Sequence, residues 1–113
     1  MSRFVEVLVA AAVSAAMFVP SAWAEDVKTY SLSLKEKSFI PAEIKVPAGQ
    51  AFVIEFSNEN ASPAELESAE LHIEKVAPGN GKIVIRVKAL EAGTYGFVDE
   101  FQEDEAKGVI IAE

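Results

Sequence analysis

Alternation of apolar and polar residues with a period of two is the feature that most constrains how this chain can fold. It runs through 30–34, 52–56 and 83–87, where every second residue is large and apolar. Successive side chains of a strand point to opposite faces, so this period predicts strands with one buried face rather than helices. A last apolar run at 109–112 predicts a closing strand.

Turn signals separate these runs. Pro and Gly residues cluster at 47–49 and 78–81, and a third turn signal lies at 91–93. Short strands at this spacing predict an all-β fold, an antiparallel sandwich of about seven strands.

Segment 62–75 allows two interpretations. It begins with Ser-Pro-Ala-Glu, which has the form of a capped helix N-terminus, so one short helix is possible here. A short strand over 64–67 would instead place Leu66 in the core, with Glu65 and Glu67 on the opposite face.

The first 24 residues, Met1–Ala24, have the pattern of a secretory signal peptide. Arg3 lies near the start, an apolar stretch follows over 7–19, and the small-residue site Ala-Trp-Ala ends at Ala24. We expect cleavage after Ala24, which leaves one domain of 89 residues, 25–113. A retained membrane anchor is the alternative.

Composition excludes several classes of function. The chain has no Cys, and its two Met residues, Met1 and Met17, lie in the leader, so disulfides and thiol nucleophiles are absent. A net charge of −8 disfavours nucleic-acid partners and favours cations or basic protein surfaces. His72 is the single histidine, and no nucleophile elbow or phosphate-binding loop is present. We therefore expect a protein that is not an independent hydrolase.

The order of several short motifs resembles the cupredoxin family, whose fold is a Greek-key β-sandwich. The resemblance covers nearly all of 25–113, and the motifs that carry it are Phe-Ile-Pro-Ala-Glu-Ile-Lys-Val-Pro-Ala-Gly at 39–49, Phe-Ser-Asn-Glu-Asn at 56–60, Pro-Gly at 78–79, Gly-Thr-Tyr-Gly-Phe at 93–97 and Lys-Gly at 107–108.

Three further segments, 62–68, 74–75 and 99–101, resemble a cupredoxin subgroup associated with bacterial iron uptake. This narrower resemblance implies a periplasmic protein that works beside a periplasmic iron-binding protein and an iron permease.

The resemblance also shows which copper ligands this chain lacks. The first His position falls on Ala64, the Cys on Asp99, the second His on Gln102, and the Met near Glu105–Ala106. Because a blue-copper site needs a Cys thiolate, we expect no type 1 copper centre.

Carboxylates are abundant near the same end of the implied fold. The candidate metal ligands are Glu65, Glu67, Glu70, His72, Asp99 and Glu100, with Glu67 and Asp99 as the leading pair. Oxygen ligands with at most one imidazole suit iron or another hard or borderline cation, and copper if His72 takes part. The acidic run at 103–105 is interpreted as solvated surface.

Three hypotheses follow. The first is a metal-binding accessory of an iron-uptake system, which binds or passes on iron through the carboxylates. The second is copper-dependent oxidation of Fe(II) before transport. The third is a metal-free adaptor that keeps the cupredoxin scaffold for protein contact.

Overall fold

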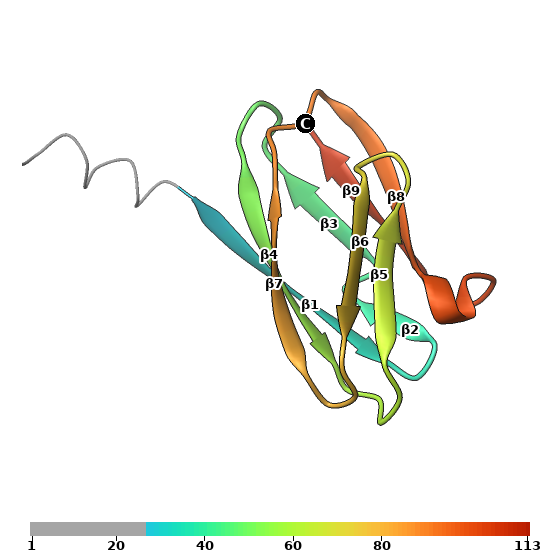
Figure 1. Cartoon of the computed structure of the whole chain (residues 1–113). Helices are drawn as coiled ribbons and strands as arrows, with labels where there is room; N and C mark the ends of the chain where they lie inside the picture. The colour runs from blue at the N-terminus through green and yellow to red at the C-terminus, as the bar shows by residue number, and fades with distance from the viewer. Residues whose placement is uncertain (1–26) are drawn as a thin grey trace, which may run out of the picture.

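The computed structural model describes residues 27–113, and the expected signal peptide, Met1–Ala24, lies outside the described residues. Within 27–113 the chain forms a sandwich of nine strands in two sheets, with one 3-10 helix, so the all-β prediction is confirmed with two more strands than expected (Figure 1). None of the helical structure in this part of the chain is long and apolar enough to cross a membrane. The elements are β1 (Lys28–Lys35), β2 (Ser38–Ile40), β3 (Glu43–Val46), β4 (Phe52–Asn58), β5 (Ala64–Ser68), β6 (Ile73–Ala77), β7 (Lys82–Val87), β8 (Gly93–Asp99), η1 (Glu100–Gln102) and β9 (Lys107–Ala112).

The strands form one four-stranded sheet, in the order β2-β1-β4-β7, and one five-stranded sheet, in the order β3-β9-β8-β5-β6. Two neighbouring pairs are parallel, β1 with β4 and β3 with β9, so the prediction of an antiparallel sandwich is wrong for these two pairs. The physical reason is the long connection between the two members of each pair, which lets the chain return in the same direction.

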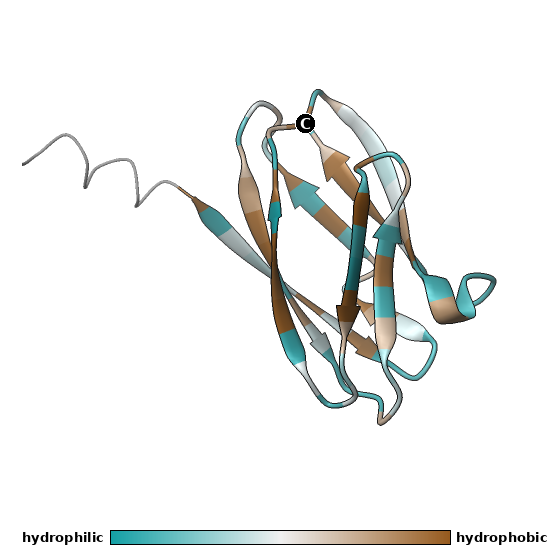
Figure 2. Ribbon diagram, in the orientation of Figure 1, coloured by the Kyte–Doolittle hydropathy of each residue, from teal (hydrophilic) through white to brown (hydrophobic). Residues whose placement is uncertain are grey.

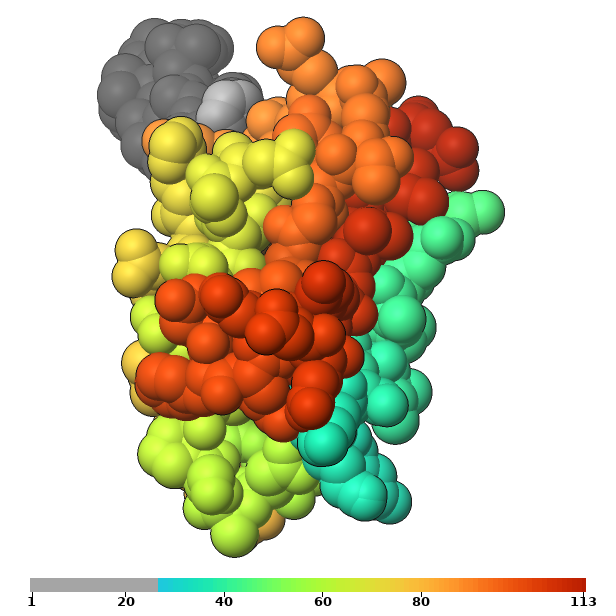
Figure 3. Space-filling model, turned by 90° about the vertical axis from the view of Figure 1, so that its right-hand side faces the viewer, coloured from blue at the N-terminus to red at the C-terminus, as the bar shows by residue number. Residues whose placement is uncertain are grey.

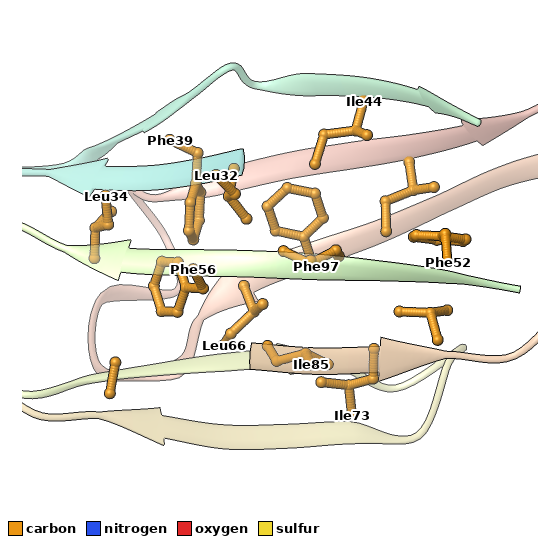
Figure 4. Packing of buried hydrophobic residues seen from close by; sticks show 14 of the residues in the cluster. Leu32, Leu34, Phe39, Ile44, Phe52, Phe56, Leu66, Ile73, Ile85 and Phe97 are labelled. Carbon is orange, nitrogen blue, oxygen red and sulfur yellow. The ribbon is translucent and has the colours of Figure 1, made fainter. Parts of the chain in front are cut away.

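The alternating apolar residues meet between the two sheets. Figure 2 shows the alternation of hydrophobic and hydrophilic residues along the strands, and Figure 4 shows the apolar side chains packed in the core. Leu34 and Phe56 are fully buried, and the rings of Phe39 and Phe97 pack edge to face with centroids 4.9 Å apart. A Cβ on Gly108 would collide with the Phe97 ring, so the Lys-Gly motif at the start of β9 lets this strand pack closely.

Segment 62–75 contains no helix. Its two strands, β5 and β6, form an antiparallel hairpin in which Leu66 is only 2% exposed. Glu65 and Glu67 are half-buried on the opposite face. The strand interpretation is therefore confirmed and the helix is wrong, because burial of every second residue outweighs the local capping signal.

Candidate metal centre

The pairing of β5 with β8 decides which acidic side chains can meet. Leu66 lies opposite Asp99, and Glu67 lies opposite Val98. Asp99 therefore shares the inner face of the sheet with buried Leu66, whereas Glu67 lies on the outer face. The two leading candidates of the sequence analysis project from opposite faces of one sheet.

Asp99 is 2% exposed, and hydrogen bonds occupy both of its carboxylate oxygens. Its Oδ1 accepts from the backbone N–H of Glu65 at 3.0 Å and from that of Phe101 at 3.2 Å. Its Oδ2 accepts from Nε2 of Gln102 at 2.9 Å. Asp99 thus caps η1 and ties the end of β8 to β5, as a satisfied buried carboxylate.

The hydrogen bonds continue from Gln102 into the turn between β1 and β2. Nε2 of Gln102 also donates to the carbonyl oxygen of Glu36 at 3.0 Å. Asn60 holds the same turn, because Nδ2 donates to the Glu36 carbonyl and Oδ1 accepts from the Glu36 N–H. We call Asp99, Gln102, Glu36 and Asn60 the Asp99 network. In Figure 3 the orange-red segment at 100–106 lies over β5 and beside this turn.

A second group of acidic residues meets on the outer face. Glu67, Glu100 and Glu103 each bring a carboxylate oxygen to within 4.8 Å of the others. Glu67 and Glu100 are half-buried, whereas Glu103 is exposed. Glu100 begins η1 and Glu103 follows its end, and residues three apart lie above one another in a 3-10 helix. We call these three residues the three-glutamate cluster.

The cluster is electrostatically strained at neutral pH. The pKa of Glu67 is raised from 4.5 to about 7, first because its carboxyl shares a hydrogen bond with Glu100 and then because of desolvation. Repulsion from Glu100, Glu74 and Glu65 adds to this rise in pKa. Oε2 of Glu100 is buried and has no hydrogen-bond partner within 27–113. A proton or a cation placed among these oxygens would relieve both problems.

Comparison with known proteins identifies the family. The sequence model of the family described as cupredoxin-like domain matches residues 7–112. The chain belongs to this family. An uncharacterized protein of Rickettsia prowazekii (strain Madrid E) is 28% identical over 87 residues, which cover 77% of this chain and 70% of that protein.

Solved structures agree with this cupredoxin-like fold. The metal-binding domain of the Cu(I)-exporting P-type ATPase CopA of Streptococcus pneumoniae D39, solved with Cu(I), gives a TM-score of 0.69 at 21% identity, covering 79% of this chain and 89% of that one. Auracyanin A, a blue copper protein of Chloroflexus aurantiacus, gives 0.64 at 18% identity, with 75% and 98% covered. At these identities the likeness establishes the fold alone.

The copper bound by these two relatives raises the question of whether this cupredoxin-like domain could hold the metal at the positions that the resemblance implies. Ala64 has no donor atom, and Asp99 and Gln102 are committed to each other. Glu105 pairs with Lys37 at 3.1 Å, and Ala106 is buried. With no Cys in the chain, these residues do not fit a type 1 copper centre.

The structure brings together two of the six predicted site residues, Glu67 and Glu100. It adds Glu103, which belongs to the acidic run at 103–105 that is predicted to be solvated surface. The other four lie outside the cluster. Glu65 points outward beside it, Asp99 points inward, Oε1 of Glu70 accepts from the Gly96 N–H at 3.0 Å, and His72 is exposed in the β5–β6 turn. The i, i+3 spacing of Glu100 and Glu103 was the signal that could have found the third residue.

Proposed function

We propose that this cupredoxin-like domain is a periplasmic accessory of an iron-uptake system and that it binds iron as cargo through the three-glutamate cluster. The observation that carries the proposal is the convergence of Glu67, Glu100 and Glu103 within 4.8 Å. Three carboxylates suit a hard or borderline cation such as Fe(II), Fe(III) or Mn(II).

The electrostatics of the cluster support cation binding. The raised pKa of Glu67 means that one position is about half protonated near neutral pH. A divalent cation would displace this proton and supply the partner that Oε2 of Glu100 lacks. The net charge of −8 also raises the local concentration of cations around the protein.

The position of the cluster suits transfer of the cargo. Glu103 is exposed, and the cluster lies on the outer face of the sheet, so a bound ion would be reached without opening the core. Three carboxylates leave coordination positions for water or for ligands from a partner. The partners that we propose are the periplasmic iron-binding protein and the iron permease implied by the sequence resemblance.

The test is an anaerobic titration of the purified protein with Fe(II), Mn(II), Ca(II) and Cu(II), in which calorimetry measures the binding of each metal. The Glu67→Gln, Glu100→Gln double variant should lose at least about tenfold in Fe(II) affinity, because two of the three negatively charged ligands of the cluster are removed. The matched control is Glu65→Gln, which removes a charge from the same strand and face but outside the cluster, and we expect about a twofold change from lost long-range attraction.

Two results would redirect the proposal. Tighter binding of Ca(II) than of Fe(II) would make this an ordinary calcium site. No saturable binding of any of the four metals would favour the metal-free adaptor, and the Asp99 network, which needs no metal to stay satisfied, supports that second candidate. If binding is found, cross-linking to an iron-permease component, with and without Fe(II), tests the transfer step.

A further inference from the structure

An exposed phenylalanine lies in the acidic loop that follows β8. Phe101, in η1, is 59% exposed, whereas the other four phenylalanines of 27–113 are buried in the core. A single exposed apolar residue is common on protein surfaces and needs no explanation by itself. The shape, the rigidity and the charge of its surroundings distinguish Phe101 from such a residue.

Phe101 lines a hollow of about 760 Å³, which we call the Phe101 hollow. Its other walls come from the β1–β2 turn at 36–38 and from the segment at 60–63, and in Figure 3 these segments meet the orange-red loop on the side that faces the viewer. Exposed Ala61 and Pro63 add apolar surface to the same hollow. Aromatic residues beside apolar surface are enriched in the buried centres of protein interfaces.

The backbone around the Phe101 hollow is held by hydrogen bonds of the Asp99 network. Oδ1 of Asp99 accepts from the Phe101 N–H at 3.2 Å, and Nε2 of Gln102 donates to the Glu36 carbonyl at 3.0 Å. Asn60 joins the third wall to Glu36. A surface that is fixed in advance loses little conformational entropy when it binds a partner. Asp99 and Gln102 thus hold this surface in shape without a metal.

The charges around Phe101 are mostly negative. The ring also lines a second hollow formed by 100–105, whose acidic residues are Glu100, Glu103, Asp104 and Glu105. In the Phe101 hollow, Glu36 is exposed. Within 27–113, Lys37 is the one cationic residue that lines either hollow, and Glu105 pairs with it at 3.1 Å. The exposed ring is therefore surrounded by an excess of negative charge.

This excess of negative charge decides between two kinds of partner. In a symmetric contact between two copies of this chain, the acidic loop of one copy would face that of the other, and like charges across an interface oppose association. A protein surface with Lys and Arg around an apolar depression matches both the ring and the charges around it. Arg side chains also stack on aromatic faces.

We propose that Phe101 and the acidic residues around it form a docking surface for a basic protein, which receives the Phe101 ring in an apolar depression. Glu100 and Glu103 of the three-glutamate cluster lie beside Phe101 in the same loop, so a docked protein reaches the cluster. The inference names the partner surface for the proposed function and rests on that function for the identity of the cargo.

The first test is photo-cross-linking in cells that express the full chain. The cross-linking residue p-benzoylphenylalanine replaces Phe101, and in the matched control it replaces Val84, which is 60% exposed on the outer face of the other sheet. We expect one protein to be cross-linked from position 101 and not from position 84. Mass spectrometry of the cross-linked peptide should identify a segment rich in Lys and Arg.

The second test measures the affinity of that protein, once purified, by calorimetry. Phe101→Ala should weaken binding by at least about tenfold, as the loss of a central aromatic contact does in other interfaces. Val84→Ala, the matched control, should change the affinity by less than about twofold.

A pair of double variants tests the role of charge. Glu36→Gln, Asp104→Asn neutralises two exposed acids outside the three-glutamate cluster and should weaken binding by about threefold or more, with a smaller dependence on salt. Glu43→Gln, Glu91→Gln neutralises two exposed acids elsewhere and should have less than about a twofold effect.

Several results would overturn the docking surface: no capture from position 101, equal capture from both positions, capture of a second copy of this chain or of an acidic segment, or an affinity that Phe101→Ala leaves unchanged. The Fe(II) titration of the purified protein is a separate measurement, because Phe101→Ala removes no metal ligand and should leave Fe(II) affinity unchanged. Fe(II) binding without docking would overturn the docking surface alone. Docking without Fe(II) binding would overturn the cargo alone.

Discussion

The two faces of the β5–β8 pair place a carboxylate in opposite environments. On the inner face, Asp99 is buried, and its two oxygens accept three hydrogen bonds. Glu67 lies on the outer face and follows Leu66, the residue that pairs with Asp99. Other carboxylates surround Glu67, and its pKa is raised to about 7. The hydrogen-bond donors around a carboxylate therefore decide its role. Asp99 holds the fold, whereas Glu67 needs a proton or a cation.

The largest expected effect is on the inner face. Asp99→Ala removes the acceptor of two backbone N–H groups and of Gln102, so we expect the free energy of unfolding to fall by about 3 kcal/mol. Urea denaturation measures it. Asp104→Ala, which truncates an exposed acid of the same loop, should change stability by less than about 0.5 kcal/mol. Similar values for the two variants would contradict the structural role of Asp99.

On the outer face, removal of a carboxylate should not lower the stability of the fold. Glu67→Gln removes a carboxylate repelled by Glu100, Glu74 and Glu65, so at pH 8 we expect the variant to be at least as stable as the natural protein. Because folding raises the pKa of Glu67, the folded chain binds more protons than the unfolded chain between pH 4.5 and about 7. Stability from this group is therefore full below pH 4.5 and is lost as the pH rises through about 7.

Urea denaturation of both proteins across pH 4–8 checks this prediction. The decline in stability assigned to Glu67 should be present in the natural protein and absent in Glu67→Gln. Parallel pH profiles would show that Glu67 titrates normally and that the two faces differ less than proposed.

Protons and cations should compete for Glu67 on the outer face but not for Asp99 on the inner face. Saturating Mn(II) should raise the thermal midpoint of the natural protein at pH 7.5 and have little effect at pH 5, where Glu67 is protonated. Asp99→Asn, which keeps the inner side chain in shape, is the control that should retain the Mn(II) response. A response of equal size at both pH values would place the bound ion away from Glu67.

The smallest effect concerns the outside of the loop. Lys37→Gln breaks the ion pair with Glu105, whose side chains are 66% and 49% exposed. Solvent screening limits such a pair to about 0.5 kcal/mol or less, so we expect almost no change in stability and no change in cation affinity. A loss of cation affinity would contradict this expectation and would mean that the Lys37–Glu105 pair helps to position the three-glutamate cluster.

Much of the fold can be predicted from the alternation of apolar and polar residues, because burial of one strand face requires a period of two in the sequence. The strand at 64–67 is also predicted, but only as one of two interpretations, because Ser62 and Pro63 locally favour a helix. The parallel pairs could not be predicted, because a period of two gives no information on strand direction. The composition of the carboxylate site was more difficult to predict than the fold. Whether Asp99 points inward depends on its register with Leu66, 33 positions away, and grouping Glu103 with Glu100 required the 3-10 turn.

The sheet order has a consequence for how the chain reaches this structure. β9 lies between β3 and β8, and Ile44 pairs with Ile110, 66 positions later. Pairings so distant in sequence are late and slow to form. A chain growing from its N-terminus therefore carries β3 without a partner, and β8 with one open edge, until residues 107–112 have emerged. During that interval two unpaired edges can join another chain, so the nascent protein is most prone to aggregation just before its last strand is added.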